Sequence, residues 1–196
     1  MDLSAVARHE ATVVTGECRE SAVLVSLLDG ESLLFTKRAE HLPNHPGQMS
    51  FPGGRREPTD ATLWETAVRE GCEEVALDGD RLERVGRLDD IRTVTNFSVR
   101  PFVTWAPDRT YEPNSPEVAE TAVLPVSALT DPENYDSEAR DHPHHGRIRL
   151  HYFRVDGYTV WGATARMLAQ FLELTTDWTV PDEADRVVDT DAEFPV

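Results

Sequence analysis

Apolar residues recur every three to four positions between Asp60 and Leu77, and this spacing predicts an amphipathic helix. The members of the apolar stripe are Trp64, Ala67, Val68, Gly71, Cys72 and Val75. We expect this helix to begin near Asp60 to Thr62, because Asp60 suits an N-cap and Thr62 with Glu65 has the form of a capping box. A second stripe of this kind predicts a closing helix over 161–174.

Short apolar, β-branched runs predict strands elsewhere in the chain. They cover residues 21–28, 33–37, 82–88, 97–105, 121–124, 149–155 and 158–161. Asp29-Gly30 and Asp156-Gly157 each separate two such runs, which is typical of a β-hairpin. Residues 131–147 are polar, and we expect them to form a loop. Strands mixed with two helices indicate the α/β class.

The length of the chain, 196 residues, suits one well-cored domain better than two. Neither an internal repeat nor a linker divides the sequence, so we expect a single domain over 1–180. From Pro181 onward the sequence is acidic and poor in apolar residues. We therefore expect 181–196 to be a mobile tail.

The chain is strongly acidic, with a formal net charge of −17 at pH 7. Lys37 is the only lysine, and the acidic excess is spread along the whole chain. This composition resembles the acid-rich surfaces of proteins from salt-loving organisms. Such a field repels nucleic acid, so we expect no nucleic-acid partner. It also repels a phosphorylated substrate unless metal ions or salt screen the charge.

Targeting and redox signals are sparse. Cys18 and Cys72 are too few for a disulfide framework and are interpreted as thiols in a reducing compartment. The N-terminal residues lack a basic region followed by an apolar run, and no segment approaches the ~20 apolar residues of a membrane span. These features predict a cytoplasmic protein without membrane association, and they leave a homodimer open.

Three glutamates fall near the end of the first predicted helix, on the side opposite its apolar stripe: Glu70, Glu73 and Glu74. Adjacent carboxylates repel one another unless a positive charge lies between them, and hard Mg²⁺ or Mn²⁺ prefers oxygen ligands. A solvated helix face is the alternative interpretation. Arg69 directly before the cluster, and the Gly53-Gly54 pair whose backbone amides can approach a phosphate, favour a metal site.

Taken together, these residues resemble a known signature. Gly54, Arg69-Glu70 and Glu73-Glu74, in this order, resemble the Nudix box of hydrolases that split nucleoside diphosphates linked to another group. Asp60 stands where the box has its first glutamate, one additional residue separates it from Arg69, and Ala76 replaces the last glycine. The resemblance implies a Nudix fold, with a mixed β-sheet sandwiched between α-helices, and Mg²⁺ or Mn²⁺ bound by the three glutamates.

A second resemblance covers the irregular segment 33–54, in which three prolines exclude a helix. The signature upstream of the box in the coenzyme A pyrophosphatase branch is matched by Thr36, Arg38, Leu42, Gly47, Phe51, Pro52, Gly53 and Gly54. This implies cleavage of coenzyme A or its derivatives to 3′,5′-ADP and 4′-phosphopantetheine. Basic groups would help to hold the additional 3′-phosphate, and the local candidates are Lys37, Arg38, Arg55 and Arg56.

Two other functions remain open. The first is the same metal chemistry on ADP-ribose, a dinucleoside polyphosphate or an oxidised nucleotide. The second is a nucleotide-binding regulatory module without catalysis. The three intact glutamates speak against the second, because a binding module need not keep mutually repelling acids.

Each candidate residue has an expected role. One glutamate removes a proton from the attacking water, and Glu70, Glu73 and Glu117 are the candidates. Glu117 lies where Nudix enzymes often take an acid from the far side of the sheet, with Glu120 as the alternative. Arg69 is expected to orient the glutamates by ion pairing, while Gly53 and Gly54 shape the loop that contacts substrate.

His142, His144 and His145 crowd the polar stretch, and three histidines raise the alternative of zinc. Pro143 interrupts them, and neither a cysteine nor a second ligand cluster accompanies them. We therefore interpret them as residues of a polar loop.

Overall fold

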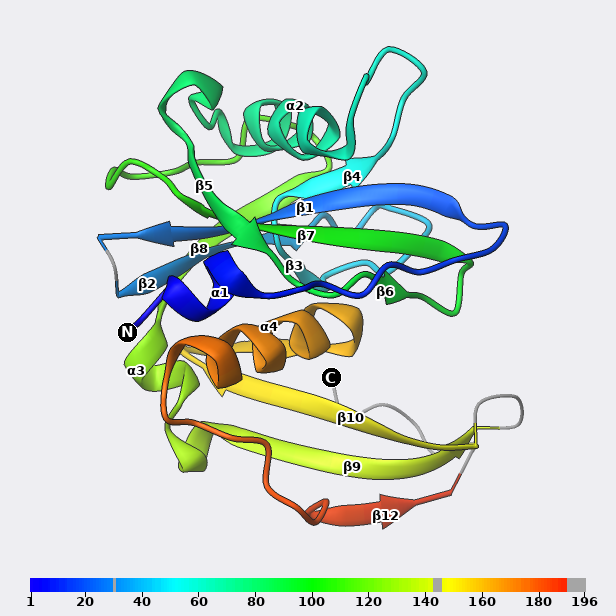
Figure 1. The fold of residues 1–196 in the computed structure, drawn as a ribbon. Coiled ribbons are helices and arrows are strands. Elements are labelled where there is room, and N and C mark those ends of the chain that lie inside the picture. The colour runs from blue at the N-terminus through cyan, green and yellow to red at the C-terminus, as the bar shows by residue number, and fades with distance from the viewer. Residues whose placement is uncertain (30, 143–145, 190–196) are drawn as a thin grey trace.

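The computed structural model describes residues 1–29, 31–142 and 146–189, which form two β-sheets and the helices that pack on them (Figure 1). The eight-stranded sheet consists of β1 (Arg19–Leu28), β2 (Ser32–Arg38), β3 (Met49–Ser50), β4 (Gly53–Arg55), β5 (Glu83–Arg87), β6 (Ile91–Arg92), β7 (Phe97–Trp105) and β8 (Val118–Pro125). The four-stranded sheet consists of β9 (Tyr135–His142), β10 (Gly146–Val155), β11 (Tyr158–Trp161) and β12 (Arg186–Val188).

The helices are α1 (Ser4–Arg8), α2 (Leu63–Val75), α3 (Val126–Leu129) and α4 (Gly162–Thr175), with single 3₁₀ turns at Gly79–Arg81 and Pro132–Asn134. Helix α2 covers one face of the larger sheet, and α4 lies between the two sheets (Figure 1). Among the described residues, none of the helices has the length and hydrophobicity of a membrane span.

Strand β1 lies at the centre of the larger sheet and is covered on both faces. It runs parallel to β7 and antiparallel to β2 and β4, so the sheet is mixed, as predicted. Successive residues of a strand face opposite sides. Leu24 packs with Ala67 of α2 in one apolar cluster, whereas Val25 packs with Leu168 of α4 in the other. The sheet therefore lies between helices, and the predicted fold class is confirmed.

The expected loop over 131–147 was wrong, because Tyr135–His142 forms strand β9. This strand pairs antiparallel with β10 from Tyr135↔Phe153 to His142↔Gly146. The strand was not predicted because its sequence lacks an apolar run. Its buried residues include Glu138, which is almost completely buried and pairs with Arg140 at 2.8 Å. An ion pair thus takes the place that an apolar residue would normally fill in a strand.

The segment from Pro181 also differs from the expected mobile tail. Arg186–Val188 forms β12, which runs parallel to β9. The Arg186 guanidinium contacts Asp136 at 2.9 Å and Glu138 at 3.4 Å, so acidic residues of β9 hold this segment in place. The remainder of the predicted tail, residues 190–196, lies outside the described part of the chain.

Candidate active site

Helix α2 begins at a capping motif formed by Thr62 and Glu65. The Thr62 hydroxyl accepts a hydrogen bond from the Glu65 amide at 3.2 Å, and Thr62 has the extended backbone of an N-cap. The Glu65 carboxylate in turn accepts from the amide of Ala61 at 2.8 Å. The predicted capping pair is confirmed, whereas Asp60 is not the N-cap.

Asp60 instead binds Arg69 across the loop that precedes the helix. The Asp60 carboxylate accepts two hydrogen bonds from Arg69, both at 3.0 Å, and one from the Thr66 hydroxyl at 3.0 Å. This two-pronged contact lowers the pKa of Asp60 well below its usual range and raises the pKa of Arg69. Asp60 is buried and fully occupied by these contacts, so it acts as the anchor of Arg69.

The Arg69 guanidinium also contacts two of the three glutamates. Its Nη1 lies 3.1 Å from Glu70 Oε1 and 3.4 Å from Glu73 Oε2. Its Nη2 donates to the carbonyl of Arg55 at the end of β4, at 3.0 Å. One side chain therefore ties β4 to the helix and lies against the carboxylates of Glu70 and Glu73.

The third glutamate, Glu74, points into the protein rather than into solvent. It is only 8% exposed, and its Oε2 accepts a hydrogen bond from the Gly53 amide at 3.0 Å. Burial raises the pKa of Glu74 to about 7, and the charge of Glu70 adds to this effect. Burial likewise raises the pKa of Glu70, against the opposing influence of Arg69. The site thus holds clustered carboxylates at an energetic cost that a cation would relieve.

Gly53 and Gly54 of β4 lie directly against the carboxylates of Glu74 and Glu70. A Cβ atom on Gly53, whose φ is +151°, would lie 2.3 Å from the carbonyl oxygen of Ala22 on β1. A Cβ atom on Gly54 would lie 2.4 Å from the carboxyl carbon of Glu70. Gly53 therefore allows β4 to approach β1, whereas a side chain at position 54 would displace the Glu70 carboxylate. The Gly53 amide, expected to face a phosphate, is engaged by Glu74 in this arrangement.

Residues from the β2–β8 side complete the surroundings of the glutamates. Glu117 is exposed directly before β8, and its carbonyl accepts from the Ala39 amide at 2.8 Å. The charge of Glu117 raises the pKa of both Glu70 and Glu74, whereas the charge of Arg38 lowers that of Glu74. The Glu120 carboxylate contacts β11 instead, where it accepts a hydrogen bond from the Tyr158 hydroxyl.

The predicted basic residues separate into two groups. Lys37 lines a hollow of about 480 Å³, together with residues of the 40–49 segment and of β11. The Arg55 guanidinium instead lies over the ring of Phe97, 5.0 Å from its centroid, and Arg56 pairs with Glu20 at 2.7 Å. The structure therefore places Lys37 in this hollow and Arg38 close enough to Glu74 to lower its pKa, whereas Arg55 and Arg56 contact Phe97 and Glu20.

The donor set suits a hard divalent cation, although it is not arranged as a finished ligand shell. Within the described residues, no three Asp, Glu, His or Cys side chains are already grouped to hold a metal ion. Contacts with Arg69 and the Gly53 amide hold the carboxylates of Glu70, Glu73 and Glu74 in their present positions. The carboxylates of Glu70 and Glu74, on adjacent helix turns and with raised pKa values, are nevertheless the oxygen ligands that Mg²⁺ or Mn²⁺ prefers. For the suggested zinc site, His144 and His145 lie outside the described residues.

Asn114 is a structural element of the site that the sequence does not reveal. Its side-chain amide donates to the carbonyls of Cys72 and Glu73, at 3.3 and 3.1 Å, and its backbone amide donates to that of Glu74 at 2.7 Å. These contacts satisfy carbonyls at the end of α2. The only signal in the sequence was a proline-rich loop, which says nothing about where Asn114 lies.

A mixed sheet between helices, with three glutamates at the end of a helix that packs over a glycine strand, defines an α/β domain with a candidate metal site on α2. The NUDIX domain family matches residues 19–148 of this chain. The chain belongs to the NUDIX family, and the resemblance of its glutamate motif to the Nudix box is confirmed at this level.

Two relatives with more than 35% sequence identity carry the same protein name. A protein from Enterobacter sp. (strain 638), named "Uncharacterized Nudix hydrolase NudL", is 39% identical over 158 residues, covering 78% of this chain and 80% of the relative. A protein of the same name from Pectobacterium atrosepticum is 36% identical over 158 residues, with the same coverage. These relatives support pyrophosphohydrolase activity.

Solved structures show more distant likenesses. The NUDIX domain of Shewanella oneidensis NrtR, complexed with ADP ribose, has a TM-score of 0.47 and 16% identity over 58% of this chain and 76% of that chain. A C. elegans Ap4A hydrolase binary complex has a TM-score of 0.46 and 19% identity, over 56% of this chain and 81% of that chain. Both likenesses are too remote to bear on the substrate.

Proposed function

We propose that this protein hydrolyses the diphosphate bond of coenzyme A or a coenzyme A derivative in a reaction that requires Mg²⁺ or Mn²⁺. The observation that carries the proposal is that the 33–54 segment leads into the glycine strand of the glutamate cluster and also lines a hollow with β11. At the end of this segment the Gly53 amide donates to Glu74, and earlier in it Lys37 lines the hollow. The segment that resembles the coenzyme A signature therefore forms a wall of the hollow.

The glutamates would hold the ions, and Arg69 would keep Glu70 and Glu73 oriented through its contacts at 3.1 and 3.4 Å. When bound, Mg²⁺ or Mn²⁺ supplies the positive charge that offsets the diphosphate and lowers the pKa of the attacking water. Glu74 is held by the Gly53 amide, which aligns its carboxylate with β4. Proton removal from water falls to Glu70, Glu73 or Glu117, which face the same region.

The remainder of the substrate would extend along β2. Arg38 lies close enough to the glutamates to influence the pKa of Glu74, so it is placed to pair with a phosphate near the metal ions. Lys37 lines the hollow with Gln48 and Tyr158, where it can bind the 3′-phosphate of coenzyme A. The hollow has the volume of a small-molecule site.

A substrate panel tests the proposal. Coenzyme A, ADP-ribose, NADH and nucleoside triphosphates are incubated with Mg²⁺ or Mn²⁺ at low and high salt, and the products are separated by chromatography. We expect coenzyme A to be cleaved in preference to the others, with release of 3′,5′-ADP. Preferential cleavage of ADP-ribose or a nucleotide would overturn the substrate assignment but would still support the assignment of hydrolase activity. Absence of turnover with every compound would favour the alternative function, a nucleotide-binding module without catalysis.

A further inference from the structure

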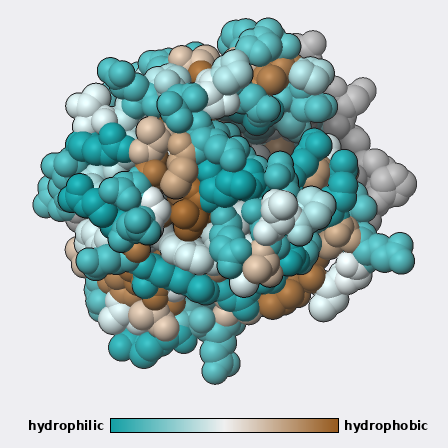
Figure 2. Space-filling view, turned by 90° about the horizontal axis from the view of Figure 1, so that it is seen from above, coloured by the Kyte–Doolittle hydropathy of each residue, from teal (hydrophilic) through white to brown (hydrophobic). Residues whose placement is uncertain are grey.

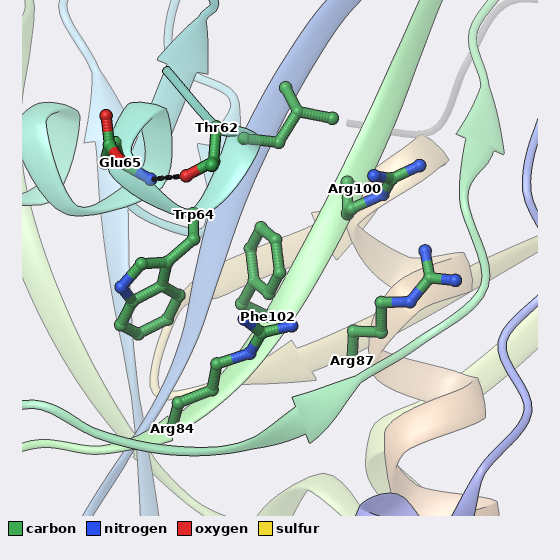
Figure 3. Close-up of a pocket in the computed structure, with 8 residues that line it drawn as sticks. Thr62, Trp64, Glu65, Arg84, Arg87, Arg100 and Phe102 are labelled. Carbon is green, nitrogen blue, oxygen red and sulfur yellow. Dashed lines mark hydrogen bonds between the residues drawn. The ribbon is translucent and has the colours of Figure 1, made fainter. Parts of the chain in front are cut away.

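A second pocket lies at the opposite edge of the larger sheet from the hollow that Lys37 lines. The sheet order β3-β2-β1-β7-β5 places the hollow of Lys37 at one end and this pocket at the other. The pocket has a volume of about 450 Å³ and is lined by the first turn of α2 and by strands β5 and β7. Its lining residues are Thr62, Leu63, Trp64, Glu65, Arg84, Arg87, Arg100 and Phe102 (Figure 3).

The pocket is rich in arginine although the net charge of the chain is −17. Its lining contains three arginines and one acidic residue, Glu65. The Asp90 carboxylate, 1% exposed, holds Arg100 through contacts of 2.9 and 2.7 Å and lies 3.6 Å from Arg87. One buried carboxylate thus serves two arginines, and Arg87 Nη1 is buried without a hydrogen-bond acceptor in the described structure. The three guanidinium groups thus outnumber the two carboxylates nearest to them, Asp90, which pairs with two of them, and Glu65, which lines the pocket.

Arg84 is the most accessible of the three arginines. Within the described residues, no carboxylate lies at ion-pair distance from it. Its guanidinium lies over the ring of Phe102, 4.7 Å from the centroid, and 5.5 Å from that of Trp64. The rings of Trp64 and Phe102 meet edge to face at 5.4 Å, and Figure 3 shows the Arg84 guanidinium beside Phe102. An unpaired guanidinium is thus held next to a half-buried indole.

We propose that this pocket is a second, non-catalytic binding site for a mononucleotide. Guanidinium groups match phosphate oxygens through paired hydrogen bonds, and Arg84 with Arg100 offers such donors. Trp64 supplies an aromatic surface on which a base can stack. The site is separate from the glutamates, although both are built on α2: its first turn lines the pocket, and Glu70 to Glu74 follow two turns later.

The test uses AMP, which has no diphosphate bond to cleave. Binding is measured by isothermal titration calorimetry and tryptophan fluorescence, in EDTA and at low salt, for the full chain and for Arg84→Glu. Arg81→Glu is the matched control, because Arg81 makes the same charge change three residues away and does not line the pocket. We expect Arg84→Glu to weaken AMP binding by about tenfold or more, and Arg81→Glu to change it by less than about twofold.

Adenosine and inorganic phosphate separate the two halves of the ligand. We expect each to bind at least about tenfold more weakly than AMP, because each lacks one of the two contacts. Binding of inorganic phosphate as tight as that of AMP would overturn the nucleotide assignment. Equal AMP binding by the full chain and Arg84→Glu, or no binding at about millimolar AMP, would overturn the site itself. Hydrolysis by Arg84→Glu, measured on the substrate panel, stays at the level of the unaltered chain, so failure here leaves the proposed activity untouched.

Discussion

At the scale of single residues, the candidate active site depends on Arg69 and the two glycines as much as on the glutamates. Arg69 contacts Asp60, Glu70 and Glu73 with one guanidinium. Gly54 leaves room for the Glu70 carboxylate, and the Gly53 amide binds Glu74. Residues without catalytic chemistry of their own therefore determine where the carboxylates lie.

Replacing Glu73 with Gln tests the role of the glutamate cluster. The Glu73 side chain is 59% exposed, so the substitution leaves the fold intact. We expect turnover to fall about 10²-fold or more, because a neutral amide binds a divalent cation poorly. The measurement is kcat on coenzyme A with Mg²⁺, and Glu83→Gln on β5 is the control with the same chemical change. Full activity in Glu73→Gln would contradict the metal-site assignment.

The raised pKa of Glu74 predicts a pH dependence of stability in metal-free protein. In the unfolded chain this carboxyl titrates near its ordinary value of 4.5, and in the folded chain burial raises its pKa to about 7. The folded state therefore binds more protons between these values, and the free energy of unfolding falls as pH rises from 4.5 to 7. The loss attributable to Glu74 is at most about 3 kcal/mol.

Urea unfolding in EDTA at several pH values between 5 and 8 measures this effect. We expect Glu74→Gln to reduce the decline relative to the unaltered chain, since the amide does not titrate. Added Mg²⁺ should raise the free energy of unfolding most at pH 8, where Glu74 is ionised. Parallel curves for the two proteins would contradict the assignment of the decline to this carboxyl.

At the scale of elements, helix α2 has a well-defined beginning and a less favourable end. Thr62 and Glu65 cap its N-terminus. At its C-terminus Ala76 adopts the left-handed conformation with φ +53°, where glycine is preferred. Ala76 stands where the Nudix box has its last glycine, so the structure gives a physical reason for that position of the motif.

Replacing Ala76 with Gly should therefore stabilise the protein. We expect the free energy of unfolding to rise by about 0.5–1 kcal/mol, because glycine adopts positive φ without steric cost. Urea unfolding at fixed pH provides the measurement. Ala119→Gly, on an exposed position of β8, is the control and should destabilise by up to about 1 kcal/mol. A loss of stability in Ala76→Gly would contradict the strain at this residue.

At the scale of the whole molecule, the two sheets share one apolar core. Val25 of β1, Phe153 of β10 and Leu168 of α4 belong to the same buried cluster. We infer from this that residues 1–180 fold as a single domain. Figure 2 shows hydrophilic residues over most of the face seen from above α2.

Removal of residues 181–196 tests the contribution of β12. The truncated chain loses Arg186, which contacts Asp136 and the buried Glu138, and Asp185, which accepts from the Ser137 amide at 2.7 Å. We expect the free energy of unfolding to fall by about 1–3 kcal/mol, because buried polar groups lose partners. Thermal and urea unfolding measure the change. Val187→Ala, at a position 68% exposed, should change stability by less than about 0.5 kcal/mol.

Much of the larger sheet and the motif helix could be predicted, because their signals are local. The strand at 97–105 is observed at Phe97–Trp105, and the apolar stripe of α2 is buried against β1. The polar strand β9 and the ordered segment β12 could not be predicted, since buried ion pairs replace apolar residues there. Within the candidate site, the capping pair at Thr62 was predictable, whereas the Asn114 cap was not.

The sequence by itself determined the helix, the order of its glutamates and the family to which the chain belongs. These properties depend on residue spacing along one element, where the helical period alone makes Glu70, Glu73 and Glu74 neighbours. Only the tertiary structure decided that Gly53 binds Glu74, that Glu117 faces the cluster, and that Arg55 lies over Phe97. The physical reason is that such contacts join residues far apart in the chain, and their geometry is set by how sheets and helices pack.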